Sequence, residues 1–169
     1  MTTTPPPVRE PAWSLSRSAI GLWVVQGVVG ALVAGLVATV FVLVVPPWDG
    51  AGRALRWLVP LAALAYAAVA IGVRPWVRYR VHRWEVTGDA VYALTGWLTR
   101  TWTLVPISRI QTVDVTRGVL QQLFGLASVA VLTASSQGTV LIPHLPAGVA
   151  ERVAEDLARR AEQVRDQAT

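Results

Sequence analysis

Two long stretches of this chain carry no charged side chain, and they constrain its fold more than any other feature. Ala19–Val45 and Trp57–Val73 are twenty-seven and seventeen consecutive residues without Asp, Glu, Arg or His. Charge at the centre of a lipid bilayer is costly, and about twenty apolar residues in a helix cross the hydrocarbon core. The sequence therefore predicts a transmembrane helical hairpin in the first half of the chain.

The composition changes along the chain and predicts three parts. Residues 1–14 are rich in Thr and Pro, which favours a disordered tail. Residues 15–83 form the predicted hairpin with a basic juxtamembrane segment, and residues 84–169 form a soluble domain. The expected first helix runs from near Leu15 to Pro46-Pro47, and the second from between Arg53 and Trp57 to about Val73.

The arginines predict how the hairpin is oriented. Its loop carries Arg53 and Arg56 beside Asp49. The opposite side carries six: Arg9, Arg17, Arg74, Arg78, Arg80 and Arg83. Positive charge is retained on the cytoplasmic side of a membrane. We therefore expect a multi-pass protein of the inner or plasma membrane with both termini in the cytoplasm.

The net charge of +5 looks like a nucleic-acid signal until it is divided between the two halves. Residues 1–83 carry +6 and residues 84–169 carry −1. A protein that binds nucleic acid would place its basic excess on the folded domain. The charge distribution therefore argues against a nucleic-acid partner, and the absence of cysteine excludes disulfides and thiolate sites.

The juxtamembrane segment is a candidate lipid or interface site. It consists of four arginines and two interleaved aromatic residues: Arg74, Arg78, Arg80, Arg83, Trp76 and Tyr79. One interpretation is a topology determinant with an aromatic belt, which is the simpler and favoured one. The alternative is recognition of anionic lipid headgroups, at about 1 kcal/mol per basic group near the surface.

Small residues recur along the predicted helices, at Gly27, Ala31 and Gly35 in the first and at Ala68 and Gly72 in the second. Small side chains let helix backbones approach closely. Packing of the two helices on each other is the favoured explanation, and a homo-oligomer or a partner membrane protein is the other. Neither span holds a charge, which argues against a transporter core.

From Trp84 onward, short apolar runs and alternation predict a mostly-β domain closed by a helix. The expected strands are Trp84–Thr87, Ala90–Thr95, Thr101–Val105, Ile110–Thr116, Ser128–Ala134 and Thr139–Ile142, with a hairpin turn at 135–138 and the sheet ending at Pro143 and Pro146. Val119–Phe124 reads as a helical turn, and Ala147–Asp166 as an amphipathic helix. The expected core includes Trp102, Val113, Val115, Val129, Val131 and Leu157.

Three segments carry a resemblance to a known family: Pro106–Val113, Leu120–Val129 and Val131–Ala134. With the preceding hairpin, they resemble bacterial membrane proteins that carry a pleckstrin-homology-like domain. The resemblance implies a seven-stranded, strongly bent β-sandwich capped by the C-terminal helix, and association with a larger membrane protein that carries several such domains. It does not imply phosphoinositide binding, because the Trp97–Thr101 loop offers a single arginine.

No motif for catalysis, a metal or a cofactor stands out in the sequence. His82 and His144 lack metal-ligand spacing, and Asp114 lies on the polar phase of an alternating strand. Arg109, Asp114 and Arg117 form a candidate partner surface, for which a structural ion pair is the simpler explanation. We therefore expect a non-enzymatic interaction or scaffold module without cofactors, with lipid recognition as the alternative.

Overall fold

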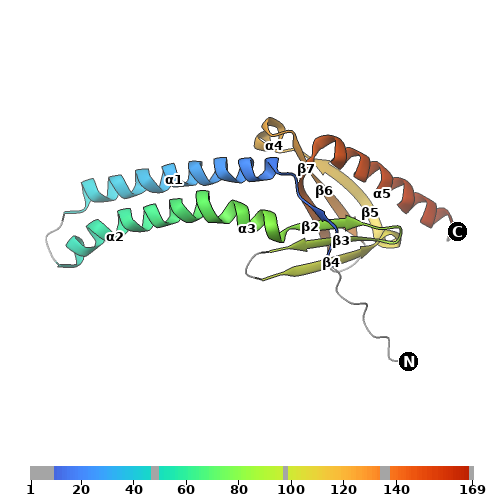
Figure 1. The fold of residues 1–169 in the computed structure, drawn as a ribbon, viewed down its shortest axis with the longest axis horizontal. Coiled ribbons are helices and arrows are strands. Elements are labelled where there is room, and N and C mark those ends of the chain that lie inside the picture. Colours follow the sequence, from blue (N-terminus) through green and yellow to red (C-terminus); the bar gives the residue numbers. More distant parts are fainter. Residues whose placement is uncertain (1–9, 47–49, 97–98, 134–137, 168–169) are drawn as a thin grey trace, which may run out of the picture. The chain divides into compact units, whose positions relative to one another are not determined.

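The computed structural model describes residues 10–46, 50–96, 99–133 and 138–167 (Figure 1). The chain divides into two compact units, one formed by Ile20–Val77 and the other by the residues on either side of it. Residues 135–137 of the hairpin turn predicted at 135–138, and the first two residues of the Trp97–Thr101 loop, lie outside the described residues.

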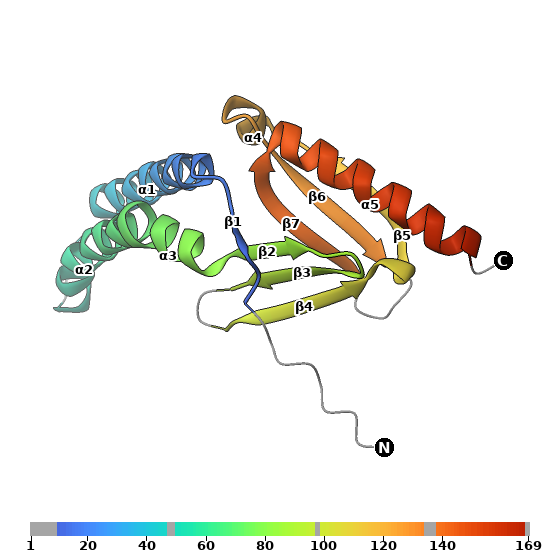
Figure 2. The same cartoon turned by 45° about the vertical axis from the view of Figure 1, so that its right-hand side comes forward.

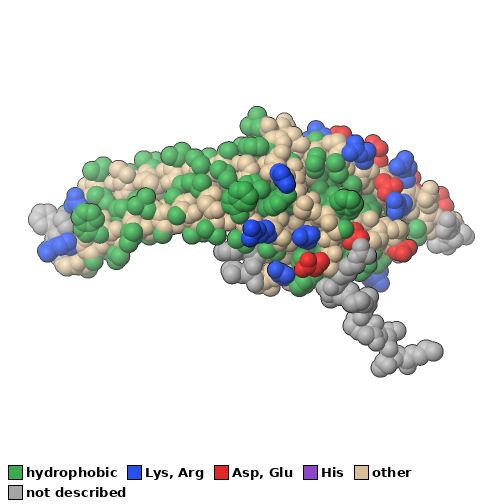
Figure 3. Space-filling view, viewed as in Figure 1, with side chains coloured by type: hydrophobic (Ala, Val, Ile, Leu, Met, Phe, Trp, Pro, Cys, Tyr) green, Lys and Arg blue, Asp and Glu red, His purple; other side chains and the backbone are tan. Residues whose placement is uncertain are grey.

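The first unit is built from two long apolar helices. Helix α1 spans Ser18–Val44. Helix α2, Gly50–Ala67, continues through the π-helical segment η1, Ala68–Val73, into α3, Arg74–Val81. Both are long and apolar enough to cross a membrane, with mean hydropathy values of 2.6 and 1.8. On the face seen in Figure 3, hydrophobic side chains cover the helices along most of their length. The second helix is longer than predicted, because the basic segment continues it.

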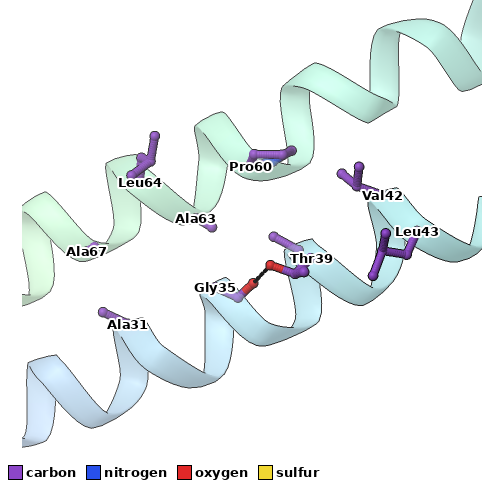
Figure 4. A pocket seen from close by; sticks show the side chains of 10 residues that line it. Ala31, Gly35, Thr39, Val42, Leu43, Pro60, Ala63, Leu64 and Ala67 are labelled. Carbon is purple, nitrogen blue, oxygen red and sulfur yellow. Dashed lines mark hydrogen bonds between the residues drawn. The ribbon is translucent and has the colours of Figure 1, made fainter.

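The two helices pack closely at some of the small residues and not at others. A Cβ atom added to Gly27 would lie 2.5 Å from the carbonyl oxygen of Ala70, so only glycine fits there. A Cβ atom added to Gly35 would meet no atom of the other helix within 4 Å, and Gly35 lines an open groove of about 470 Å³ between the helices (Figure 4). Hairpin packing therefore accounts for Gly27, and it does not account for Gly35.

The second unit begins with a short strand that was not predicted. Strand β1, Trp13–Ser14, pairs antiparallel with β2, Arg83–Val86, through Trp13 opposite Trp84 and Ser14 opposite Arg83. The Ala12 N–H also donates to Oε2 of the buried Glu85 at 3.0 Å. The prediction of a tail to residue 14 is therefore wrong for these residues, because a distant partner orders them, and residues 1–9 lie outside the described part.

Two antiparallel sheets, a long C-terminal helix and a short helix between two strands of the second sheet form the described part of the domain (Figure 2). The first sheet has the order β1-β2-β3-β4, with β3 at Ala90–Thr95 and β4 at Thr101–Pro106. The second has the order β5-β6-β7, with strands at Ile110–Thr116, Leu126–Thr133 and Thr139–Pro146. The 3-10 turn η2, Ile107–Arg109, joins the sheets, and α4, Val119–Leu123, joins β5 to β6. The predicted sandwich is confirmed, although β7 runs past Pro143, which an edge strand tolerates.

Helix α5, Ala147–Gln167, packs on β5, β6 and η2 and closes the core. Val129, Val131 and Leu157 are fully buried, as predicted, and Val113 packs half-buried against them. Trp102 and Val115 are 45% and 37% exposed, so their predicted burial is wrong. Both lie on edge strands, β4 and β5, where a neighbouring strand covers one side only.

Candidate functional site

The juxtamembrane segment does not form a single surface, because it is helical. At about 100° per residue, α3 places Arg74 and Arg78 on one face and Trp76 and Arg80 on the opposite one. Trp76 is 56% exposed and Arg80 is exposed, whereas Arg78 and Tyr79 are half-buried. Arg83 lies beyond the helix, half-buried in β2. The six predicted residues are therefore distributed around α3 and β2.

A β-bulge in β7 shapes the nearest polar cluster. Ala127 pairs with Leu145 and Val129 with Ile142, so Pro143 and His144 together oppose the single residue Ser128. His144 takes a left-handed conformation with φ of 55°, which is uncommon for a residue other than glycine. Bulges of this kind redirect one side chain out of the regular strand pattern.

The bulge brings together four polar side chains from distant parts of the chain. Gln121 Nε2 of α4 donates to Ser128 Oγ at 2.7 Å and lies 3.0 Å from His144 Nδ1. The His144 backbone N–H lies 3.4 Å from the same Ser128 oxygen. His82 contributes its ring near the same place, with Nδ1 2.8 Å from the Arg78 carbonyl oxygen. We call Gln121, Ser128, His82 and His144 the polar cluster.

Burial, and after it the charge of Arg78 and that of His82 when protonated, together lower the pKa of His144 to about 4. Burial also lowers the pKa of His82, against the opposing effect of its hydrogen bond to the Arg78 carbonyl. Both imidazoles are therefore neutral at pH 7, and each can donate or accept a hydrogen bond. Among the described residues, no three His, Asp or Glu side chains lie close enough to hold a metal ion.

A groove of about 570 Å³ lies on another side of the domain, between α5 and the strands β1 and β2. Its floor and walls combine two tryptophans, apolar side chains and charged side chains. It is lined by Trp13, Trp84, Val86, Val149, Arg152, Val153, Glu155, Asp156, Arg159 and Arg160. We call it the Trp13–Trp84 groove.

The Trp13–Trp84 groove is lined by three arginines and two tryptophans, which donate hydrogen bonds, and by two carboxylates, which accept them. The buried indole Nε1–H of Trp84 has no hydrogen-bond partner among the described residues, which is a cost that a bound acceptor would remove. Arg160 is already used, because it donates to the Thr87 carbonyl at 3.1 Å and pairs with Asp156 at 2.7 Å. Arg159 lies 3.8 Å from Asp156 with its side chain 69% exposed. The groove thus suits an extended segment that carries acceptors and acidic groups.

The predicted partner surface is not brought together as a unit. Arg117 pairs with Glu151 of α5, so its charge ties the end of β5 to the helix. Arg109 ends η2, and Asp114 lies on β5 opposite Ala130. Both are exposed, and among the described residues no ion pair joins Asp114 to Arg109 or to Arg117.

Sequence reasoning missed the groove and the polar cluster because both depend on pairings between distant residues. Trp13 and Trp84 are seventy-one positions apart and meet only through the β1–β2 register. His82 and His144 meet only through the bulge in β7. The one local signal was the unusual dipeptide Pro143-His144 within an otherwise apolar strand.

Comparison with known proteins gives one family and one relative. A model of the family described as Bacterial PH domain matches residues 20–161 of the chain. The chain is 26% identical over 157 residues to the UPF0699 transmembrane protein YdbS of Bacillus subtilis (strain 168). That match covers 90% of this chain and 94% of the relative. No solved structure matches the chain.

Proposed function

The chain belongs to the bacterial PH domain family, and we propose that it is a membrane-anchored, non-enzymatic interaction module. The membership confirms the resemblance drawn from the sequence. Together with a transmembrane relative and two apolar helices, it identifies a membrane protein that carries a pleckstrin-homology-like domain.

The Trp13–Trp84 groove is the observation that carries the proposal. Exposed aromatic and arginine side chains are the residue types enriched at protein interfaces, and Trp13 is 61% exposed here. A bound segment would cover this ring and supply an acceptor for the Trp84 indole. Binding would thereby remove the exposure of the Trp13 ring and the unmet hydrogen bond of the Trp84 indole, which both cost stability in the free domain.

The partner we propose is another membrane protein with related domains, contributing an extended acidic segment. Strand β1 pairs with Arg83 and Trp84 of β2, and Trp13 and Trp84 both line the groove. Arg152 and Arg159 would complement carboxylates on the same segment.

Photo-crosslinking in cells tests this proposal. A crosslinker placed at Val149, which lines the groove, should capture a membrane protein with pleckstrin-homology-like domains. The control position is Val164, which is 38% exposed on α5 and lies outside the groove. Arg152→Glu with Arg159→Glu should reduce the Val149 adduct severalfold, and Arg109→Glu should leave it unchanged. Identical adducts from both positions, or none from Val149, would refute the proposal.

We also propose that both termini are cytoplasmic, since six arginines flank the hairpin on that side, whereas only Arg53 and Arg56, in the first turns of α2, lie near its other end. A reporter that is active only in the cytoplasm, fused after Thr169, should be active. A reporter that requires export should be silent at the same position and active when inserted between α1 and α2. The reverse pattern would place the domain on the other side of the membrane.

Recognition of anionic lipid by the juxtamembrane segment is less well supported by the geometry. Only part of the segment is exposed, and Arg74 and Arg80 lie on opposite faces of α3. Four charges that converge on one headgroup would require a common face. The arrangement therefore favours the protein-interaction proposal over a specific headgroup site.

A further inference from the structure

Helix α4 carries the two most exposed large apolar side chains of the domain among its described residues. Val119 is 78% exposed and Leu123 is 77% exposed. They stand at positions i and i+4 of the helix and therefore project from the same face. Exposed apolar side chains that are adjacent in space, unlike scattered ones, mark a surface that is covered in use.

The rest of α4 holds this pair in a fixed orientation. Gln121, about 200° around the helix from Val119, points to the opposite face and hydrogen-bonds Ser128 and His144. Its Oε1 accepts from the Gly118 N–H at 3.0 Å and so closes the helix start. Because Gln121 fixes one face of α4 to the domain, Val119 and Leu123 are directed away from it.

The position of α4 within the domain indicates what covers this face. Gln121 of α4 touches His144, and the charges of Arg78 and His82 both act on His144. Arg78 belongs to the last turn of the second apolar helix, and His82 directly follows that helix. The polar cluster therefore connects α4 to the end of the domain at which the chain enters the membrane.

We propose that Val119 and Leu123 insert into the interfacial layer of the bilayer on the side where the domain lies. The occupant is lipid, because the end of the domain that carries α4 is already joined to the membrane by the spanning helix. Apolar side chains on a short amphipathic turn bind this layer by burying area at the boundary between headgroups and acyl chains. The inference is independent of the partner protein and of which leaflet is involved.

A fluorescent label in the full-length protein tests the insertion directly. The chain contains no cysteine, so Leu123→Cys and Val119→Cys each provide a unique site for an environment-sensitive nitrobenzoxadiazole label. The matched control is Val164→Cys, an exposed apolar position about 25 Å along α5 from the helix start near α4. Each protein is reconstituted in phosphatidylcholine–phosphatidylglycerol nanodiscs, with and without lipid that carries a nitroxide near the headgroup.

Insertion predicts that labels at 119 and 123 emit at shorter wavelength than the label at 164 and lose more than half their fluorescence to the nitroxide lipid. The label at 164 should be unaffected by that lipid. Equal behaviour at all three positions would overturn the proposal. Protection of residue 123 from a water-soluble quencher without quenching by nitroxide lipid would also overturn it, because protein would then cover α4.

Discussion

Truncation of Leu157 to Ala should lower the free energy of unfolding of the domain by about 2–5 kcal/mol. Leu157 is fully buried in α5, and it belongs to the same core cluster as Val129 and Val131 of β6. Shortening the side chain removes transfer free energy and leaves a cavity that a close-packed core refills only partly. The loss is large because one helix seals the second sheet.

The measurement is hydrogen exchange of the β6 amides in the detergent-solubilised full-length protein, which reports opening of the core. Val164→Ala on the same helix is the matched control, since Val164 is 38% exposed. Truncation of Val164 should cost less than about 1 kcal/mol, because this side chain is partly exposed and lies outside the buried core. A loss below about 0.5 kcal/mol for Leu157→Ala would mean that α5 does not seal the core as described.

The parts of the fold that depend on neighbouring residues could be predicted from the sequence. Ile110–Thr116 was expected as a strand and is one, because alternation along seven residues is recorded in the chain itself. The two apolar helices follow from the absence of charge over a span that matches a bilayer. Likewise, Gly125 ends the helical turn in a left-handed conformation, with φ of 64°, which glycine adopts without cost.

The parts that depend on long-range register could not be predicted in the same way. Nothing near Trp13 indicates that it will pair with Trp84, because only the folded sheet sets that register. The bulge at Pro143-His144 has the same origin, since an extra residue in β7 is defined only by its partner strand. The juxtamembrane arginines show a further limit. Their spacing was visible, but their separation onto two faces required knowing that the helix continues to Val81.

The domain should lose stability as the pH falls from about 6.5 to about 4, and His144 should account for much of the loss. Its pKa is about 4 in the folded protein against 6.5 for an unperturbed histidine. Between these values the unfolded chain binds a proton that the folded protein does not, so stability falls as pH decreases through this window. The stability that the neutral His144 imidazole contributes is fully present above about pH 6.5. The partial exposure of His144 limits the effect to about 1–3 kcal/mol.

His144→Asn isolates this contribution. Asparagine tolerates the left-handed backbone that His144 adopts, and it keeps a polar side chain beside Gln121 and Ser128 without titrating. Thermal unfolding of both proteins is followed by tryptophan fluorescence at several pH values between 4 and 7.5. The difference between the two curves reports the loss of the His144 imidazole together with its electrostatic coupling to His82. The wild type should lose more stability than His144→Asn on acidification.

Arg78→Gln should weaken the wild-type pH dependence, because the Arg78 charge helps to keep His144 neutral. Parallel curves for wild type and His144→Asn would show that the imidazole is not held neutral by the fold.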